Sequence, residues 1–148
     1  MIRFVNEDMF SATFDAYVNP VNCKGTMGKG LALEFKKRYP MNFILYKDIC
    51  DQGKLKPGYI YWTRDITTNT IIINFATKDH WKDPSRSEWI DSGCMKLREY
   101  LLDNPHNIKD IAIPKLGCGL GGLDWSYVRK IFFKYFNDIT NVDIYVYA

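Results

Sequence analysis

Long apolar runs are absent from this sequence, and none approaches the roughly 20 residues that a membrane-spanning helix requires. The first eight residues also lack the apolar segment of a secretory signal peptide. Cysteine is scarce and scattered, without a C-x-x-C pair, which argues against a zinc site or a disulfide framework. The cysteines are Cys23, Cys50, Cys94 and Cys118. We therefore expect a cytoplasmic protein with reduced thiols, no metal site and no membrane association.

An excess of charge of one sign is also absent. Lys and Arg number 20 and Asp and Glu 17, and the net charge of +3 does not by itself indicate a nucleic-acid-binding protein. Hydrophobic residues make up 47% and charged residues 25%, which is typical of a soluble globular protein. The length of 148 residues fits one domain of ordinary size. We therefore interpret residues 1–148 as a single domain.

Short β-branched or apolar runs alternate with amphipathic segments of helical length. This alternation predicts an α/β fold in which helices cover both faces of a largely buried sheet. The expected strands are Ile2–Val5, Ala16–Val21, Tyr59–Thr63, Ile71–Phe75, Ile111–Pro114 and Ile144–Tyr147. The expected helices are Lys29–Tyr39, Asn42–Asp51, Arg86–Leu102 and Trp125–Phe136.

Two of these helices carry start signals and a clear apolar face. Ser85, with Glu88 three residues later, predicts a capping box for the third helix, and Asp124 is a good N-cap for the fourth. The apolar positions recur at helical spacing and predict core faces. They are Ile90, Cys94, Leu97 and Leu101 in the third helix and Val128, Ile131, Phe132 and Tyr135 in the fourth.

Two glycine-bearing loops, Asn22–Gly30 and Gly117–Leu123, each follow a strand at its carboxyl end and lead into a helix. Ligands in open α/β sheets bind at that edge. Glycines let backbone N–H groups approach an anion, and the following helix adds a favourable dipole. Either loop alone fits a tight turn equally well, whereas the pair predicts a diphosphate cradle. The NTPase P-loop is excluded, because Lys29 is followed by Gly30 where that motif needs Ser or Thr.

Three polar side chains are candidates for the site itself. Asn22 ends a buried strand, where its amide fits either a ribose contact or a turn-stabilising hydrogen bond. Lys78 and His80 follow the fourth strand at the same functional edge. A partly desolvated lysine serves as a base or nucleophile. A solvated lysine and a packing histidine are the alternative interpretations.

Several motifs together resemble a known family. Asn6–Asp8 followed by Asp15–Asn22 resembles the opening of macrodomains, which bind ADP-ribose. Met27–Ala32, Asn74–Trp81 and Ile113–Trp125 resemble the DarG-like antitoxin macrodomains, relatives of the terminal ADP-ribose protein glycohydrolase. The resemblance spans essentially the whole chain, and its motifs occur in the same order.

This resemblance implies a largely parallel, mixed six-stranded sheet and an ADP-ribosyl glycohydrolase that removes ADP-ribose from thymine bases of single-stranded DNA. It further implies a monomer that needs no cofactor, and a cognate DNA ADP-ribosyltransferase toxin as a partner. By the motifs, Asp8 contacts adenine, Asn22 contacts the distal ribose, and Lys78 acts at the anomeric carbon. Further ADP-ribose contacts are expected from Met9, Gly25, Met27, Gly28, Lys29, Gly30, Thr77, His80, Gly117, Cys118, Gly119, Leu120, Gly121, Gly122 and Leu123.

The chain departs from the family pattern in two ways. The protein-directed glycohydrolase has an aspartate in the second loop that resolves a lysyl intermediate, whereas Gly121 stands here and matches the DNA-directed relatives. Antitoxins of this type usually carry an additional carboxyl-terminal domain, whereas this sequence ends at Ala148. Two other functions fit the pattern: an ADP-ribose 1″-phosphate phosphatase or other ADP-ribose hydrolase, and a non-catalytic ADP-ribose reader. Lys78 separates the reader from the glycohydrolase, since a reader has no use for a lysine at the reactive end.

Overall fold

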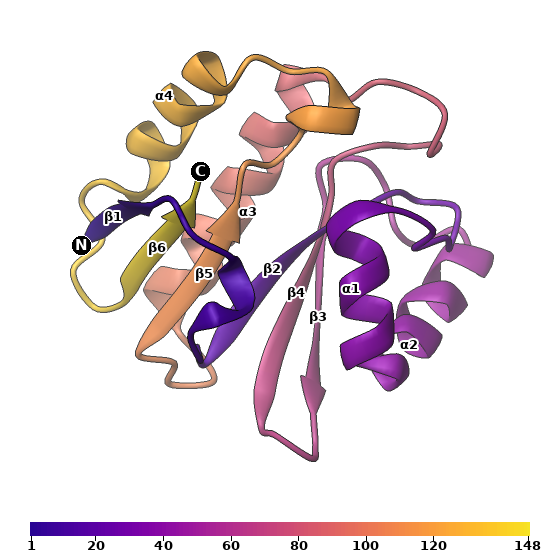
Figure 1. The fold of residues 1–148 in the computed structure, drawn as a ribbon, viewed down its shortest axis with the longest axis horizontal. Coiled ribbons are helices and arrows are strands. Elements are labelled where there is room, and N and C mark those ends of the chain that lie inside the picture. Colours follow the sequence, from indigo (N-terminus) through magenta and orange to yellow (C-terminus); the bar gives the residue numbers. More distant parts are fainter.

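The computed structural model describes all 148 residues and contains the six expected strands and four expected helices (Figure 1). The strands are β1 (Ile2–Val5), β2 (Ala16–Val21), β3 (Ile60–Asp65), β4 (Thr70–Ala76), β5 (Asp110–Pro114) and β6 (Asp143–Tyr147). The helices are α1 (Gly30–Arg38), α2 (Pro40–Asp51), α3 (Ser87–Asp103) and α4 (Trp125–Phe136), with short 3-10 helices η1 (Met9–Ser11) and η2 (Gly119–Gly121). The predicted elements are therefore confirmed, with small shifts at their ends.

The strands form one sheet in the order β1-β6-β5-β2-β4-β3. All neighbouring pairs are parallel except β3 and β4, which are antiparallel. The mixed, largely parallel six-stranded sheet is thus confirmed. Because β5, β2 and β4 are parallel neighbours, the loops that follow them lie at the same edge of the sheet.

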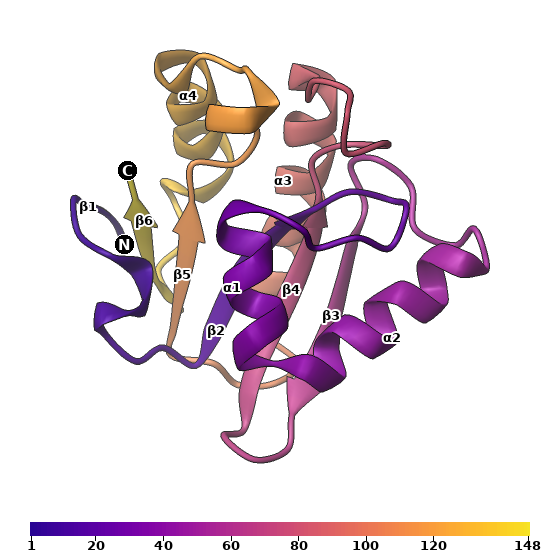
Figure 2. The ribbon, with the colours of Figure 1, turned by 45° about the vertical axis from the view of Figure 1, so that its right-hand side comes forward.

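The two faces of the sheet bury alternate residues of each strand, as the period of a strand requires. On β2, Ala16 and Val18 pack against α3 and α4, whereas Tyr17 and Val21 face α1 and α2. Figure 2 shows the two pairs of helices on opposite sides of the sheet. Because both faces of the sheet are covered, its central strands are anchored on both sides.

The predicted helix starts have different outcomes. Asp124 is the N-cap of α4 and accepts a hydrogen bond from the Ser126 amide. The predicted capping box of α3 is wrong, because Arg86 is the N-cap and makes no side-chain cap bond. The amide of Ser85 donates instead to the carbonyl of Gly121, at an N–O distance of 2.9 Å, which ties Ser85 to the second glycine loop.

The predicted core faces of α3 and α4 are largely confirmed. All four of the α3 positions are fully buried, as are Val128 and Phe132 of α4. Tyr135 is only partly buried: its ring packs on the core while its hydroxyl donates to Asp91. Phe136 takes the fully buried position at the end of α4.

Gly93 lets α3 lie close against β4. A Cβ atom at Gly93 would overlap the ring of Phe75, which is fully buried. This close packing fixes both ends of the segment 77–86, which runs from β4 to α3. None of the helices is long and apolar enough to cross a membrane.

Candidate functional site

A cleft of about 960 Å³ opens at the carboxyl edge of β5, β2 and β4. Its size lies within the range of small-molecule sites, about 300–1,000 Å³. It is lined by Pro20, Val21, Asn22, Thr26, Gly28, Lys29, Gly30, Leu31, Ala32, Thr77, Lys78, Trp81, Lys82, Ser85, Pro114, Lys115, Gly117, Cys118, Leu120 and Gly121. Most of these residues come from the two predicted glycine loops and from the segment 77–86, and the others come from the ends of β2 and β5 and the first turn of α1.

The lining of the cleft is positively charged although the whole chain is nearly neutral. Four lysines line it, and no aspartate or glutamate does: the lysines are Lys29, Lys78, Lys82 and Lys115. Such a one-signed concave surface concentrates anions. It also places no carboxylate within the lining to serve as a nucleophile or general base.

The first loop delivers the amino terminus of α1 to the cleft. The N-cap residue Lys29 makes no side-chain cap bond, and Gly30 adopts a φ of +56°, a left-handed conformation that favours glycine. The amide groups of Gly30, Leu31 and Ala32 donate to no backbone acceptor. Free N–H groups at a helix amino terminus form a ready anion site.

Asn22 organises this first loop from within. Its Oδ1 accepts hydrogen bonds from the Lys24 amide (2.9 Å) and the Tyr46 hydroxyl (2.9 Å). Its Nδ2 donates to the carbonyl and the hydroxyl oxygens of Thr26, at 3.0 and 2.8 Å. All of the hydrogen-bonding capacity of the Asn22 side chain is therefore used by the loop and by Tyr46 of α2. In the structure Asn22 takes the turn-stabilising role, and a ribose contact would require an exchange of partners.

The second loop forms the opposite wall through η2. The amides of Gly119 and Leu120 donate to no backbone acceptor, so this loop also offers N–H groups to an anion. Gly122 ends η2 in the left-handed region, at a φ of +80°, and its amide donates to Gly119. The two loops thus present separate sets of free amides from neighbouring strands, and the diphosphate cradle itself stays a prediction.

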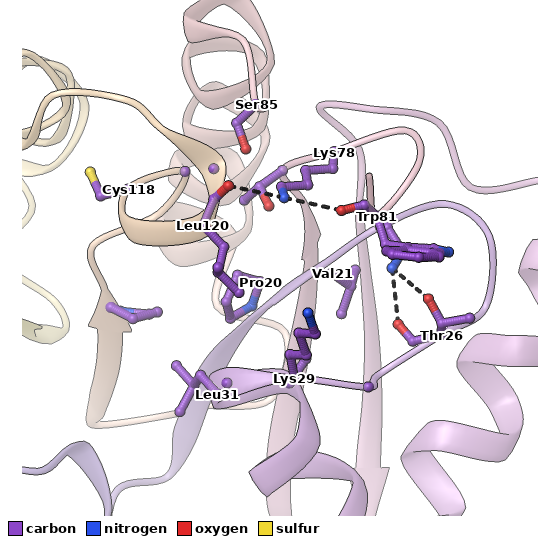
Figure 3. Close-up of a pocket in the computed structure, with 18 of the residues that line it drawn as sticks. Pro20, Val21, Thr26, Lys29, Leu31, Lys78, Trp81, Ser85, Cys118 and Leu120 are labelled. Atoms are coloured by element: carbon purple, nitrogen blue, oxygen red, sulfur yellow. Dashed lines mark hydrogen bonds between the residues drawn. The ribbon is translucent and has the colours of Figure 1, made fainter. Parts of the chain in front are cut away.

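Lys78 lies in the cleft between the two walls. Its Nζ donates to the carbonyl oxygens of Leu120 (3.2 Å) and Trp81 (3.3 Å), as Figure 3 shows. The side chain is half-buried, and its ammonium group is held in place by these two carbonyls. Lys78 therefore combines a fixed position with access to the cleft.

Two other reactive groups line the cleft. Burial raises the pKa of the Cys118 thiol, with Lys115 acting in the opposite direction, so the thiol is protonated at neutral pH and is a poor nucleophile. The Ser85 hydroxyl is buried without a hydrogen-bond partner, and the side chain is 5% exposed. A buried hydroxyl without a partner is uncommon, because it has lost water without compensation.

The structure places the predicted contact residues in three different settings. Nine of the seventeen proposed contacts line the cleft, as does Lys78: they are Asn22, Gly28, Lys29, Gly30, Thr77, Gly117, Cys118, Leu120 and Gly121. Two are core residues outside the lining, Met9 and Met27. The others also lie outside the lining, although most belong to the same loops: Asp8, Gly25, His80, Gly119, Gly122 and Leu123.

The positions of Asp8 and His80 have clear local causes. Asp8 is exposed and caps η1 by accepting a hydrogen bond from the Phe10 amide at 2.9 Å. Phe10 packs on Phe35 of α1, so η1 lies beside the helix whose amino terminus borders the cleft. His80 stacks on Trp81, and its Nδ1 accepts from the Lys82 amide.

Sequence reasoning missed several lining residues. Trp81, Lys82 and Ser85 all lie in the segment 77–86 between β4 and α3. Their position just after a strand end that was predicted to be functional could have identified them. Ser85 was instead assigned to the helix cap. The structure contains no group of three or more His, Cys, Asp and Glu side chains placed to hold a metal ion.

Comparison with known proteins identifies relatives over nearly the whole chain. The model of the "Macro domain" family matches residues 18–132. A "DNA ADP-ribosyl glycohydrolase" of Mycobacterium tuberculosis is 40% identical over 99% of this chain and 42% of its own length. A "DNA ADP-ribosyl transferase-DNA ADP-ribosyl glycohydrolase fusion protein" of Thermosipho africanus is 33% identical over 90% of this chain and 38% of its own length. The chain thus spans about two fifths of the length of these two relatives.

Solved structures show the same similarity in three dimensions. The macrodomain of Mycobacterium tuberculosis DarG superposes with a TM-score of 0.92 at 39% identity, covering 99% of this chain and 97% of that one. Thermosipho africanus DarTG in complex with ADP-ribose gives a TM-score of 0.87 at 31% identity, covering 98% of this chain and 41% of that one.

Proposed function

The chain belongs to the macrodomain family, and from this premise we propose that it is an ADP-ribosyl glycohydrolase that removes ADP-ribose from thymine bases of DNA. The names of its relatives support this activity, and one relative was solved with ADP-ribose bound. The observation that carries the proposal is the position of Lys78, held by two carbonyls in a cleft with free amides on both walls.

The cleft fits the chemistry of ADP-ribose. Each phosphate of its diphosphate carries a negative charge, and its oxygens can accept hydrogen bonds from the amides of Gly30 and Leu31 on one wall and of Gly119 and Leu120 on the other. Because these donors are fixed before the ligand arrives, little reorganisation accompanies binding. The family motif that carries Lys78 implies that the distal ribose lies on the Lys78 side of the diphosphate.

Hydrolysis breaks the bond between the anomeric carbon of the distal ribose and a ring nitrogen of thymine. Water supplies a hydroxyl to the carbon and a proton to the departing base. Positive charge develops on the ribose and negative charge on the base, so an ammonium group beside the base stabilises the separation of charge. We assign this role to Lys78, which the carbonyls of Leu120 and Trp81 orient.

Incubation with matched ADP-ribosylated substrates tests this function. The protein is expected to release ADP-ribose from ADP-ribosylated single-stranded DNA faster than from ADP-ribosylated protein. ADP-ribose 1″-phosphate, run in parallel, reports phosphatase activity. Binding of ADP-ribose without release from any substrate would make the protein a reader, and faster release from protein would reassign the substrate.

The setting of this activity is also part of the proposal. We propose that residues 1–148 act as one macrodomain and as a monomer in the cytoplasm, against a cognate DNA ADP-ribosyltransferase. The fusion of the two activities in the Thermosipho relative supports such a partner.

Asp8→Ala is expected to weaken ADP-ribose binding in a folded protein, in line with the adenine contact that the resemblance implies. The loss of one charge-assisted hydrogen bond costs about 1.5–3 kcal/mol. Calorimetry with ADP-ribose, which we expect to bind the parent at equal stoichiometry, measures the change. Asp8→Asn is the control, since asparagine caps η1 as well as aspartate does. Unchanged affinity in Asp8→Ala would confine Asp8 to capping η1.

A further inference from the structure

A second concave surface, of about 690 Å³, lies beside the cleft, and we call it the basic hollow. It is lined by Lys24, Lys56, Pro57, Asp79, Asp83, Pro84, Arg86 and Trp89. The segment 78–86 separates the two and contributes residues to both. Lys78, Trp81, Lys82 and Ser85 line the cleft, whereas Asp79, Asp83, Pro84 and Arg86 line the hollow. Two chain segments therefore border both surfaces: the segment 78–86, which carries Lys78, and the first loop, whose Asn22 and Thr26 line the cleft and whose Lys24 lines the hollow.

The charged side chains that line the hollow include more cations than carboxylates. Lys24 and Asp79 form an ion pair at 3.6 Å, both half exposed, and largely neutralise each other. Lys56 and Arg86 are exposed and form no ion pair. Asp83 is the one other carboxylate in the lining, so two unpaired positive charges face one negative charge. The hollow therefore carries a small positive excess, enough for one or two phosphates and far from a continuous basic tract.

The apolar part of the lining fits a base or a sugar. Trp89 is partly exposed, and the Arg86 guanidinium lies over its ring at 5.2 Å from the centroid. Pro57 and Pro84 add rigid apolar surface beside it. Aromatic faces next to cations are the usual lining of surfaces that bind single strands, because every base can stack on them.

Backbone hydrogen bonds hold the walls of the hollow together. The Cys23 amide donates to the Asp79 carbonyl at 2.9 Å, which joins the first loop to the separating segment. The Gly58 amide donates to the Ala76 carbonyl at 2.8 Å, which joins the Lys56 side to the end of β4. These bonds hold the walls of the hollow in position, so little conformational entropy of the protein is lost when a strand binds there.

We propose that the basic hollow binds the single-stranded DNA next to the modified thymine. This inference rests on the proposed function, which places the thymine beside Lys78. The segment 78–86 lines both the cleft and the hollow, so a strand that leaves the cleft over this segment reaches the hollow. Its contacts are to phosphates and to base faces, so they serve any sequence.

The experiment compares a charge-reversal variant with the parent on two substrates. Lys56→Glu/Arg86→Glu changes two exposed side chains outside the cleft. The substrates are ADP-ribosyl-thymidine as a nucleoside and the same unit within an oligonucleotide. We expect kcat/KM for the oligonucleotide to fall about ten-fold or more, with the nucleoside unchanged. The salt dependence of oligonucleotide binding should also become shallower by about 1.4 in log–log slope, as expected when two single-strand phosphate contacts are lost.

Lys109→Glu/Lys130→Glu is the matched control, because it reverses two exposed charges away from both concave surfaces. An equal loss in this control would assign the effect to net charge and overturn the proposal. A parallel loss on the nucleoside, or no loss on the oligonucleotide, would overturn it as well. Activity of the parent on the nucleoside reports the proposed function separately. If the parent turns over neither substrate, binding affinities test the proposal instead. Lys56→Glu/Arg86→Glu must then lose affinity for the ADP-ribosylated oligonucleotide and keep its affinity for free ADP-ribose.

Discussion

Lys78→Ala is expected to bind ADP-ribose nearly as well as the parent but to release ADP-ribose from DNA about 10²–10⁴-fold more slowly. Binding is preserved because the diphosphate meets backbone amides on both walls, whereas the Lys78 ammonium is already held by the carbonyls of Leu120 and Trp81. Turnover falls because no other lysine in the lining is held between the two walls in this way. Calorimetry with ADP-ribose and single-turnover release from ADP-ribosylated DNA measure the two halves of the prediction.

Two control variants separate the chemistry of Lys78 from its charge. Lys109→Ala removes an exposed lysine before β5, at the opposite edge of the sheet, and should leave both measurements unchanged. Lys78→Arg keeps the positive charge but releases a proton far less readily, so it should bind ADP-ribose and remain slow if proton donation matters. Turnover within a few fold of the parent in folded Lys78→Ala would remove Lys78 from catalysis and leave the reaction to the loops and a water molecule.

The fold was predictable because its signals are local and periodic. Runs such as Ile71–Phe75 are too short and too β-branched for helices, and the spacing of Ile90, Cys94, Leu97 and Leu101 matches one helical face. The edge of the sheet that carries the cleft follows from the parallel arrangement alone. Element ends were less certain, because contacts with distant residues help to set them: β5 begins at Asp110, whose carboxylate accepts a hydrogen bond from the Asp15 amide at 2.7 Å.

The composition of the cleft was only partly predictable for the same reason. A motif identifies a loop, but the packing of the loop decides which of its side chains face the ligand. Met27 belongs to a conspicuous glycine-rich motif, yet it is 2% exposed and packs in the core beneath the loop. Ser85 looked like a helix cap because Glu88 follows at the right spacing. Its amide is instead bonded to Gly121, a contact that neither segment reveals by itself.

Asn22 illustrates a third limit of prediction from sequence, because two different roles fit the same pattern. Both of its interpretations require a polar residue at the end of β2, so the sequence pattern cannot separate them. In the structure its amide is fully engaged with Lys24, Thr26 and Tyr46. A role in holding the ribose stays a prediction, because binding must exchange one of these partners.

Gly121→Ala is expected to weaken both ADP-ribose binding and turnover, because the second loop has no room for a side chain at this position. A Cβ atom at Gly121 would lie 2.6 Å from the Ser85 hydroxyl oxygen and 3.2 Å from the Ser85 Cβ. Ser85 is buried and its amide is bonded to the Gly121 carbonyl, so we expect η2 to shift and the Leu120 carbonyl to move away from Lys78. Overpacking of this kind costs about 1–3 kcal/mol, which is roughly a 5- to 150-fold effect if it falls on binding.

A double-mutant cycle with Ser85→Ala tests whether this contact is the cause. Ser85→Ala alone should be close to neutral for stability, because the hydroxyl that it removes is buried and has no partner. Combined with Gly121→Ala it removes the shorter of the two contacts and should restore most of the lost affinity, so the two changes are strongly non-additive. Simple additivity would mean that the second loop yields elsewhere and that Ser85 does not set its position. Strong non-additivity would show that packing against Ser85 is the reason why position 121 carries no side chain. The same packing would exclude a carboxylate side chain at position 121 from this cleft.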